Sequence, residues 1–569
     1  MSPNRYWNRI QRQRITRRRM LAATGVGAAG NALDAACGDD GKIEEPIITG
    51  TPDGTPQALG QPKYGNRYQA AIGLNIDTLD PHVSIAGGTA FFPRIYNLLL
   101  RQSSLKPEFV FNDLAESLEQ PDDTTWIFSI RPGVKIAPNE MGVPERDMDA
   151  VDLYESFERI KGLDQANAAV FVNEWFASHE ASADAMTYTI NAPSPYSWFI
   201  LRIGNFTNMT PPRELIQSNP ERMRDAGVGG GPFLVPPGGY TEGERLVLNK
   251  NTSYYRTDPK NNDAQLPYID GMDIKIIQDR SALRTAFLSR QSYLYFAENK
   301  DEADELLAQY DIYQGSRDPV FTFVSVTMNV ERPPFDDPRI RKAVMHSINR
   351  QQYIDIVYKG DAQANGLVHW PTGAYALPPE ELEQLQGFDA ELSKQLITDA
   401  GFDIPLKIKV MFPANSTIEE HNTHLPIFLE QMEDAGFEVE QDAQDFGTWL
   451  DNYTNKNYDI SLALNQVYEN PETPLDFQHS EGPAGDNIYS TGLQNPEIDA
   501  EIERVKRITD SEELVNAIHE LQRKIYEAGP MFLPIVSPFS RTLYWDFVKN
   551  IPEGLGVADL LLNDWWLDL

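Results

Sequence analysis

Few side chains in this sequence combine in the patterns that metal binding or catalysis requires. His421 and His424 are three residues apart, so on a helix both could face one metal ion. No third ligand is placed beside them, and we interpret the pair as part of a polar loop or a helix start. The glycines at 227–232 lack the Lys-Ser/Thr pair of a phosphate-binding loop. They predict a turn that leads into a strand at 233–235.

The usual motifs of hydrolases and nucleotide-binding enzymes are missing. The sequence contains no Gly-x-Ser-x-Gly, His-Glu-x-x-His or Walker-type segment. Its one cysteine, Cys37, cannot form an intrachain disulfide. We therefore predict a protein that is not an enzyme and has no cofactor or metal. An acid pair of the glycosidase type could lie anywhere among 84 carboxylates, so an exported hydrolase stays open as an alternative.

The first forty residues predict targeting. Arg17 and Arg18 lie in Thr-Arg-Arg-Arg-Met-Leu at 16–21, before an Ala/Gly-rich stretch that ends at Cys37. The stretch is shorter than the ~20 apolar residues that span a bilayer. It resembles a twin-arginine export signal joined to a bacterial lipoprotein signal, although Asp34 departs from the usual lipoprotein box. This resemblance implies the twin-arginine translocase as a partner and a lipid anchor on Cys37.

Composition indicates a large folded body behind this leader. The chain has 569 residues, 41% of them apolar, which is enough for several folding units. The net charge is −35, although the first 36 residues hold seven arginines and one aspartate. The rest of the chain would repel nucleic acid and anionic lipid, so we predict neither as a partner. Residues 38–63 are rich in Pro, Gly and Thr and predict a flexible tether.

Strand-like and helix-like segments alternate along the body, which predicts the α/β class with mixed sheets covered by helices. Apolar residues recur at helical spacing over 151–160 and alternate over 126–130 as on a half-buried strand. Ala-Gly-Phe occurs at 400–402 and 435–437, where a helical pattern changes to a strand pattern. Glycine suits the left-handed residue that follows a helix. Alternation at 321–329 predicts another strand.

Six blocks in the body resemble, in order, those of the solute-binding proteins of ABC importers for dipeptides, oligopeptides and nickel (family 5). The blocks are Leu-Asp-Pro at 79–81 with Ile-Tyr-Asn-Leu-Leu at 95–99, Leu-Ala-Glu-Ser at 114–117 with 126–135, 150–157, Gly-Gly-Pro-Phe at 230–233, 248–255, and Pro-Pro-Phe-Asp-Asp-Pro-Arg-Ile-Arg-Lys-Ala at 333–343. The resemblance runs along residues 68–550.

This resemblance implies a two-lobed periplasmic-binding-protein fold of class II, the large oligopeptide-binding type with an extra subdomain. The expected organisation is an export signal at 1–37, a tether at 38–63, lobe I at 64–96, 206–318 and 531–569, the extra subdomain at 97–205, and lobe II at 319–530. A solute would be enclosed between the lobes by hinge closure, without any bond being made or broken.

The resemblance also implies which residues would contact the solute. Ser325 and Thr327 align with ligand-facing strand positions of peptide-binding relatives, where a strand edge can pair with a peptide backbone. A buried hydroxyl bonded to the backbone is the alternative for both. Phe446 matches an aromatic wall position, or else belongs to the core. His421 falls near another pocket position, and Tyr295 lies in the stretch that replaces the family's Gly-Glu-Ile-Asp.

The segment 458–471 departs most from the peptide-binding pattern. Relatives carry Gly-Trp and then an aspartate whose carboxylate pairs with the α-ammonium group of the peptide. Here Leu-Asn replaces Gly-Trp, ending at Asn465, and the aspartate position falls on Tyr468 with Glu469 next to it. A desolvated ammonium group needs a countercharge. Either Glu469 supplies it, or the solute is an oligosaccharide or another uncharged molecule.

We therefore expect an extracytoplasmic receptor in the periplasm or on the outer face of the cytoplasmic membrane, anchored there through Cys37. It would be a monomer that delivers a small peptide or a similar solute to the permease subunits of an ABC importer. A surface sensor built on the same fold is a further alternative. The sequence leaves open whether the solute is a peptide, an oligosaccharide or a nickel complex.

Overall fold

The structure is a computed structural model, and the residues that it describes fall within Gly54–Leu569. They are residues 60–84, 91–102, 110–163, 166, 168–218, 220–225, 227–259, 261–315, 322–414, 419–466, 471–481, 491–539, 541–551 and 564–569. Arg17, Arg18 and Cys37 lie outside them, so the export and lipidation predictions concern a part that the structure does not describe. Among the helices of the described ranges, none is long and apolar enough to cross a membrane.

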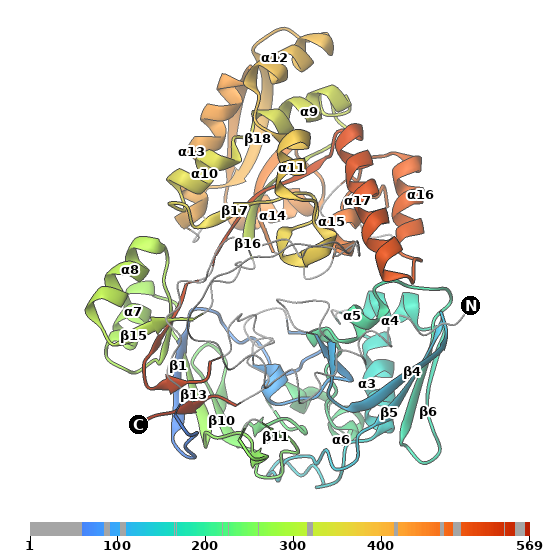
Figure 1. The fold of residues 1–569 in the computed structure, drawn as a ribbon, viewed down its shortest axis with the longest axis vertical. Helices are drawn as coiled ribbons and strands as arrows, with labels where there is room; N and C mark the ends of the chain where they lie inside the picture. Colours follow the sequence, from blue (N-terminus) through green and yellow to red (C-terminus); the bar gives the residue numbers. More distant parts are fainter. Residues whose placement is uncertain are drawn as a thin grey trace, which may run out of the picture. The chain divides into compact units, whose positions relative to one another are not determined.

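The first sheet is mixed and includes, at its edge, the strand that follows the glycine-rich segment. Its strands are β1 (Arg67–Ile72), parallel to β13 (Gly271–Ile276), then β10 (Arg245–Lys250), β8 (Phe233–Leu234) and β9 (Tyr240–Thr241). Strands β1, β13 and β10 can be followed in Figure 1. The predicted turn and strand at 227–235 are confirmed by β8. A Cβ at Gly231 would lie 2.6 Å from the Ile95 carbonyl oxygen, so close backbone packing explains this glycine.

An antiparallel sheet and three helices make up what we call the antiparallel region, residues 115–203. The strands lie in the order β4 (Ala115–Asp122), β5 (Thr125–Ile130), β7 (Thr187–Asn191) and β6 (Ser178–Ala181), and the helices are α3 (Ala150–Lys161), α4 (Ala169–Trp175) and α5 (Phe199–Ile203). Trp126, Phe128 and Ile130 are buried on β5, and Phe157 and Ile160 on α3. Both predicted periodicities are therefore confirmed.

A six-stranded sheet with its helices forms what we call the six-stranded region. The strand order is β17 (Ala362–Ala364), β21 (Phe532–Pro538), β16 (Thr322–Met328), β20 (Ile460–Gln466), β18 (Leu406–Pro413) and β19 (Phe437–Gln444). The helices are α9 (Pro338–Ser347), α10 (Arg350–Ile356), α11 (Pro379–Gln386), α12 (Ala390–Asp399), α13 (Glu419–Asp434), α14 (Phe446–Thr454), α15 (Glu472–Asp476), α16 (Pro496–Val505) and α17 (Ser511–Ala528). Gly401 and Gly436, with φ of 90° and 96°, separate α12 from β18 and α13 from β19, as predicted.

A three-stranded sheet combines strands that precede and follow the six-stranded region in the sequence. It is formed by β14 (Leu294–Phe296), β22 (Thr542–Trp545) and β15 (Ile312–Gln314), with α7 (Arg280–Leu288) and α8 (Lys300–Gln309). The expected boundary at 531 assigns β21 to the first lobe, but β21 pairs with β16 and β17. β22 pairs with β14 and β15. We therefore propose that the chain passes from the second lobe back to the first between residues 538 and 542.

Two of the family-like blocks form contacts that hold distant segments together. The Asp80 carboxylate accepts two hydrogen bonds from Arg159 of α3, at 3.0 and 2.5 Å. Burial, with Arg159 beside it, lowers the pKa of His82 to about 4, so this ring stays neutral. In the block at 333–343, Asp337 caps α9, while buried Arg341 donates to four carbonyl oxygens. These motif residues therefore serve the fold.

The Asp113 carboxylate is a fully buried charge at the base of the antiparallel region. It accepts hydrogen bonds from Arg101 Nε at 2.8 Å, from the Leu98 N–H at 2.9 Å and from the Tyr255 hydroxyl at 2.6 Å. Arg256 lies 3.4 Å away. Burial alone would raise the pKa of Asp113, but these partners lower it to about 2. One carboxylate thus joins three stretches of chain.

Replacing Asp113 with asparagine should destabilise the protein by about 3–5 kcal/mol at pH 7, because Arg101 would be left as an uncompensated buried charge. Urea unfolding measures this loss. Since the folded-state pKa lies below 3.8, the stabilisation is present above that pH and disappears as the pH falls toward 2. The control Asp304→Asn removes an exposed ion pair with Lys300 and should cost less than about 1 kcal/mol. Equal losses would contradict the prediction.

Candidate functional site

Three of the predicted contact positions follow the carboxyl ends of parallel strands. β18 pairs in parallel with β19 and with β20. His421 lies in the first turn of α13 after β18, Phe446 begins α14 after β19, and Asn465 is near the end of β20. Loops and helix starts at this edge of an α/β sheet are where such folds place ligands. The topology therefore brings these positions to one edge of the six-stranded sheet.

The strand β16 runs antiparallel to β20 in the centre of this sheet. Ser325 lies opposite Ala463, and Thr327 lies opposite Ser461, two residues further from the edge that carries Asn465. Both side chains are fully buried. The hydroxyl groups of Thr327 and Tyr453 are 2.9 Å apart and share a hydrogen bond. A ligand contact by Ser325 or Thr327 stays a prediction, and in this structure Thr327 is engaged with α14.

A stack of aromatic rings fixes α14 against the sheet. The ring centroids of Trp449 and Tyr453 are 5.1 Å apart, and those of Tyr453 and Tyr458 are 5.4 Å apart. Trp449 Nε1 also donates to Ser461 Oγ at 3.2 Å. Phe446 is the first residue of this helix, three positions before Trp449 and seven before Tyr453. The spacing of Trp449 and Tyr453, four residues apart, is a sequence signal for this stack that none of the predictions above contains.

The remaining predicted residues are placed differently. Tyr468 and Glu469 lie outside the described residues. Tyr295 is buried on β14, where its ring stacks on Phe287 with centroids 5.5 Å apart and its hydroxyl donates to Glu302 at 2.7 Å. Burial raises the pKa of Tyr295. The structure thus places Tyr295 in the core of another sheet, and its contact with solute stays a prediction.

His424 does not extend the possible metal pair with His421. Its ring is fully buried, stacks on Tyr353, and has its Nε2 atom 2.6 Å from the Tyr358 hydroxyl. Within the described ranges, no three His, Cys, Asp or Glu side chains lie close enough to hold a metal ion. The arrangement of His424 is that of a packed core histidine.

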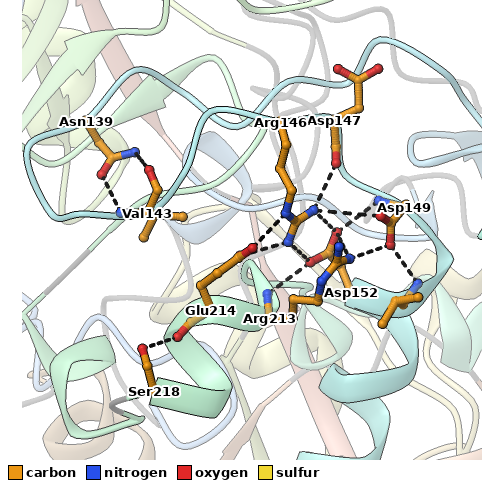
Figure 2. Close-up of polar contacts among 10 residues, drawn as sticks. Asn139, Val143, Arg146, Asp147, Asp149, Asp152, Arg213, Glu214 and Ser218 are labelled. Carbon is orange, nitrogen blue, oxygen red and sulfur yellow. Dashed lines mark hydrogen bonds and ion pairs between the residues drawn. The ribbon is translucent and has the colours of Figure 1, made fainter.

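Figure 2 shows a dense polar cluster formed by residues of the antiparallel region and of the helix that begins at Arg213. Arg146 donates two hydrogen bonds to Asp152, at 2.8 and 2.6 Å, and two to Glu214, both at 2.8 Å. Arg213 contacts Asp149 at 2.6 Å. Burial opposes it, but Arg146 lowers the pKa of Glu214. These charges pair with one another, so we interpret the cluster as a network that ties α6 (Arg213–Ser218) to the start of α3.

The fold is that of the periplasmic solute-binding proteins. It resembles DppA of Helicobacter pylori in complex with peptide STSA, with a TM-score of 0.71 at 19% identity, over 89% of this chain and 99% of the other. NikA of Brucella suis in complex with Fe(III)-EDTA gives a TM-score of 0.72 at 19% identity, over 88% and 100%. The expected α/β periplasmic-binding-protein fold is confirmed.

Sequence comparison identifies the family. The family model for bacterial extracellular solute-binding proteins, family 5 (Middle), matches residues 110–486, and the chain belongs to this family. Its members are transport proteins that bind solutes without catalysis.

Curated relatives share about a quarter of their residues with this chain. The glutathione-binding protein GsiB of Salmonella typhimurium is 25% identical over 343 residues, which cover 58% of this chain and 61% of that protein. This chain therefore matches less than two thirds of the length of that relative. A probable di/tripeptide-binding protein of Pseudomonas aeruginosa is 23% identical over 457 residues, which cover 75% of this chain and 82% of that protein.

We predict that the hydroxyl groups of Thr327 and Tyr453 are energetically coupled. In a double-mutant cycle with Thr327→Val and Tyr453→Phe, urea unfolding should give a coupling free energy of about 0.5–1.5 kcal/mol, the net value of a buried hydrogen bond. The control cycle pairs Tyr453→Phe with Thr372→Val, whose hydroxyl donates to His369 O, and should be additive. Additive losses in the first cycle would show that Thr327 does not depend on Tyr453.

Proposed function

We propose that this protein is the extracytoplasmic solute-binding component of an ABC importer, and that it captures a peptide-like solute. The observation that carries this proposal is the family match over residues 110–486, together with a fold shared with a peptide-bound relative. Relatives named for glutathione and for di- and tripeptides favour a short peptide as the solute. Permease subunits in the membrane are the partners that such a function requires.

The edge formed by β18, β19 and β20 supports this function. Helices α13 and α14 begin there, after two neighbouring parallel strands, and their first turns carry His421 and Phe446. We infer that Phe446 forms one wall of the solute site and that Asn465 and Tyr468 supply polar contacts. Glu469 would be the countercharge for a peptide ammonium group. The protein would change between an open and a closed state whose free energies differ by a few kcal/mol, and the solute would favour the closed state.

Two structural neighbours favour a second solute class within the same function. MoaA of Agrobacterium tumefaciens in complex with mannopinic acid gives a TM-score of 0.68, and NikA carries Fe(III)-EDTA. Neither bound molecule is a peptide. A polar molecule other than a peptide is therefore the alternative solute, in agreement with the replacement of the peptide-anchoring aspartate by Tyr468.

We propose, further, that the monomeric protein is exported by the twin-arginine translocase and anchored through Cys37. Arg17 and Arg18 would be read by the translocase, and acylated Cys37 would hold the body outside the cytoplasmic membrane. The tether at 38–63 would give the body the reach to meet a permease.

A solute panel tests the function. Dipeptides, tripeptides, glutathione, an oligosaccharide and a nickel–histidine complex are each added to the full chain, and the melting temperature is followed. A bound solute at about 100 times its Kd stabilises by about 2.7 kcal/mol. We expect peptides to raise the melting temperature and Phe446→Ala to weaken that binding about tenfold or more.

The matched control for Phe446→Ala is Phe388→Ala. Phe388 is exposed between α11 and α12, outside the helices that follow β18 and β19, so its removal should leave affinity unchanged. If only the oligosaccharide raised the melting temperature, the solute would be an oligosaccharide and the peptide proposal would be wrong. Turnover of any compound in the panel would contradict a binding function.

Cys37→Ser tests the anchor. We expect the wild-type chain in the membrane fraction and the variant in the soluble extracytoplasmic fraction, because the variant lacks the acylated thiol. Replacing Arg17 and Arg18 with lysine should keep the chain in the cytoplasm. Wild-type protein whose mature N-terminus carries no lipid by mass spectrometry would refute the anchor without affecting the binding function.

A further inference from the structure

A set of hydrogen bonds connects the antiparallel region to the six-stranded region. The Ser197 N–H donates to the Lys506 carbonyl at 2.7 Å, and the Ser197 hydroxyl donates to the Val505 carbonyl at 2.8 Å. Arg507 donates to the Ser194 hydroxyl at 2.9 Å. Residues about 310 positions apart in the sequence are thus joined by three hydrogen bonds of ordinary length.

A buried carboxylate of the six-stranded region, Glu472, lies beside these bonds and has two partners in the antiparallel region. The Tyr196 hydroxyl donates to Glu472 Oε1 at 2.5 Å, and Arg202 Nε is 3.8 Å from Glu472 Oε2. On the other side of the contact, Lys506 pairs with Asp476 at 3.0 Å. A carboxylate removed from water needs such partners. Glu472 therefore favours the joined arrangement as long as Tyr196 and Arg202 face it.

Each side of the polar contact keeps partners of its own, although the rings of Trp198 and Tyr375 also pack across it, with centroids 5.4 Å apart. Tyr196 is held within its own region by a ring stack on Trp175, with centroids 3.7 Å apart. Lys506 keeps Asp476 as a partner within its own region. Separation would expose Glu472, Ser197 and the carbonyl oxygens to water, which replaces each lost hydrogen bond at small net cost. Polar contacts of this kind are typical of domain interfaces that open and close.

We propose that Tyr196, Ser197 and Arg202, meeting Glu472 and residues 505–507, form a latch that holds the antiparallel and six-stranded regions together. The proposal rests on the proposed function, since a solute binder alternates between open and closed states. The latch sets how often the regions separate when no solute is bound. Residues outside the solute site would thereby control how fast a captured solute leaves.

Hydrogen exchange of the solute-free full chain tests the latch directly, because the Ser197 amide is one of its donors. Tyr196→Phe and Glu472→Ala should each raise the exchange rate of the segment around Ser197 about tenfold, the effect of about one hydrogen bond. Glu472→Gln keeps an acceptor for Tyr196 and should restore part of the protection. Unchanged exchange in Tyr196→Phe and Glu472→Ala would overturn the proposal.

Tyr188→Phe is the matched control. It removes a buried hydroxyl that bonds to His179 within the antiparallel region, at 2.8 Å. We expect it to leave the exchange of the Ser197 segment unchanged. If Tyr196→Phe accelerated exchange in α3 as strongly as around Ser197, the contact would be part of the internal stability of the region, and the latch would be refuted.

Solute release provides the second readout, with Met-Leu and reduced glutathione as probes. The latch variants should release a bound probe about tenfold faster, while Tyr188→Phe releases it at the wild-type rate. An unchanged release rate would overturn the role of the latch in solute retention. Failure of every solute to bind would count against the proposed function alone, because the exchange measurement requires no solute.

Discussion

The buried charge of Asp113 is the constraint on which the arrangement of the first half of the chain depends. A carboxylate without water must be neutralised, and here its partners come from residues 97–101 and from 255–256. The chain can satisfy it only when the antiparallel region meets the segment after β10. In the same way, the carboxylate of Asp80 is neutralised by Arg159 and joins the start of the body to α3. The antiparallel region is thereby joined firmly to the first sheet.

The candidate site depends on a different property, the direction of the strands. Parallel pairing of β18 with β19 and β20 places the ends of all three at one edge. The aromatic stack of Trp449, Tyr453 and Tyr458 then fixes the orientation of α14, and Thr327 bonds to that stack from the central strand β16. A wall residue at Phe446 would be supported by a rigid helix on a rigid sheet. Such support reduces the ordering cost of binding a solute.

Local patterns predicted the elements of this fold well, because each pattern reflects one helix or strand. The alternation on β5, the helical spacing on α3 and the glycines after α12 and α13 are of this kind. The boundary at 531 failed to anticipate that β21 pairs with β16, since pairing between distant strands leaves no local signal. Burial of Thr327 was one of the two alternatives considered, but its bond to Tyr453 was equally hidden, because a buried hydroxyl on a strand can also bond to the backbone.

The two kinds of charged contact define which parts can move. Asp113 and Asp80 are paired in ways that water cannot replace cheaply, so the antiparallel region and first sheet should move together. The hydrogen bonds of Ser197 with residues 505 and 506 join the antiparallel region to the six-stranded region, and water can replace them at small net cost. Opening should therefore separate this joined body from the six-stranded region, which the chain enters at β16 and leaves after β21. A binding protein that closes by a hinge needs both features. The antiparallel region and the first sheet must move as one body, and their contact with the six-stranded region must be able to open for release.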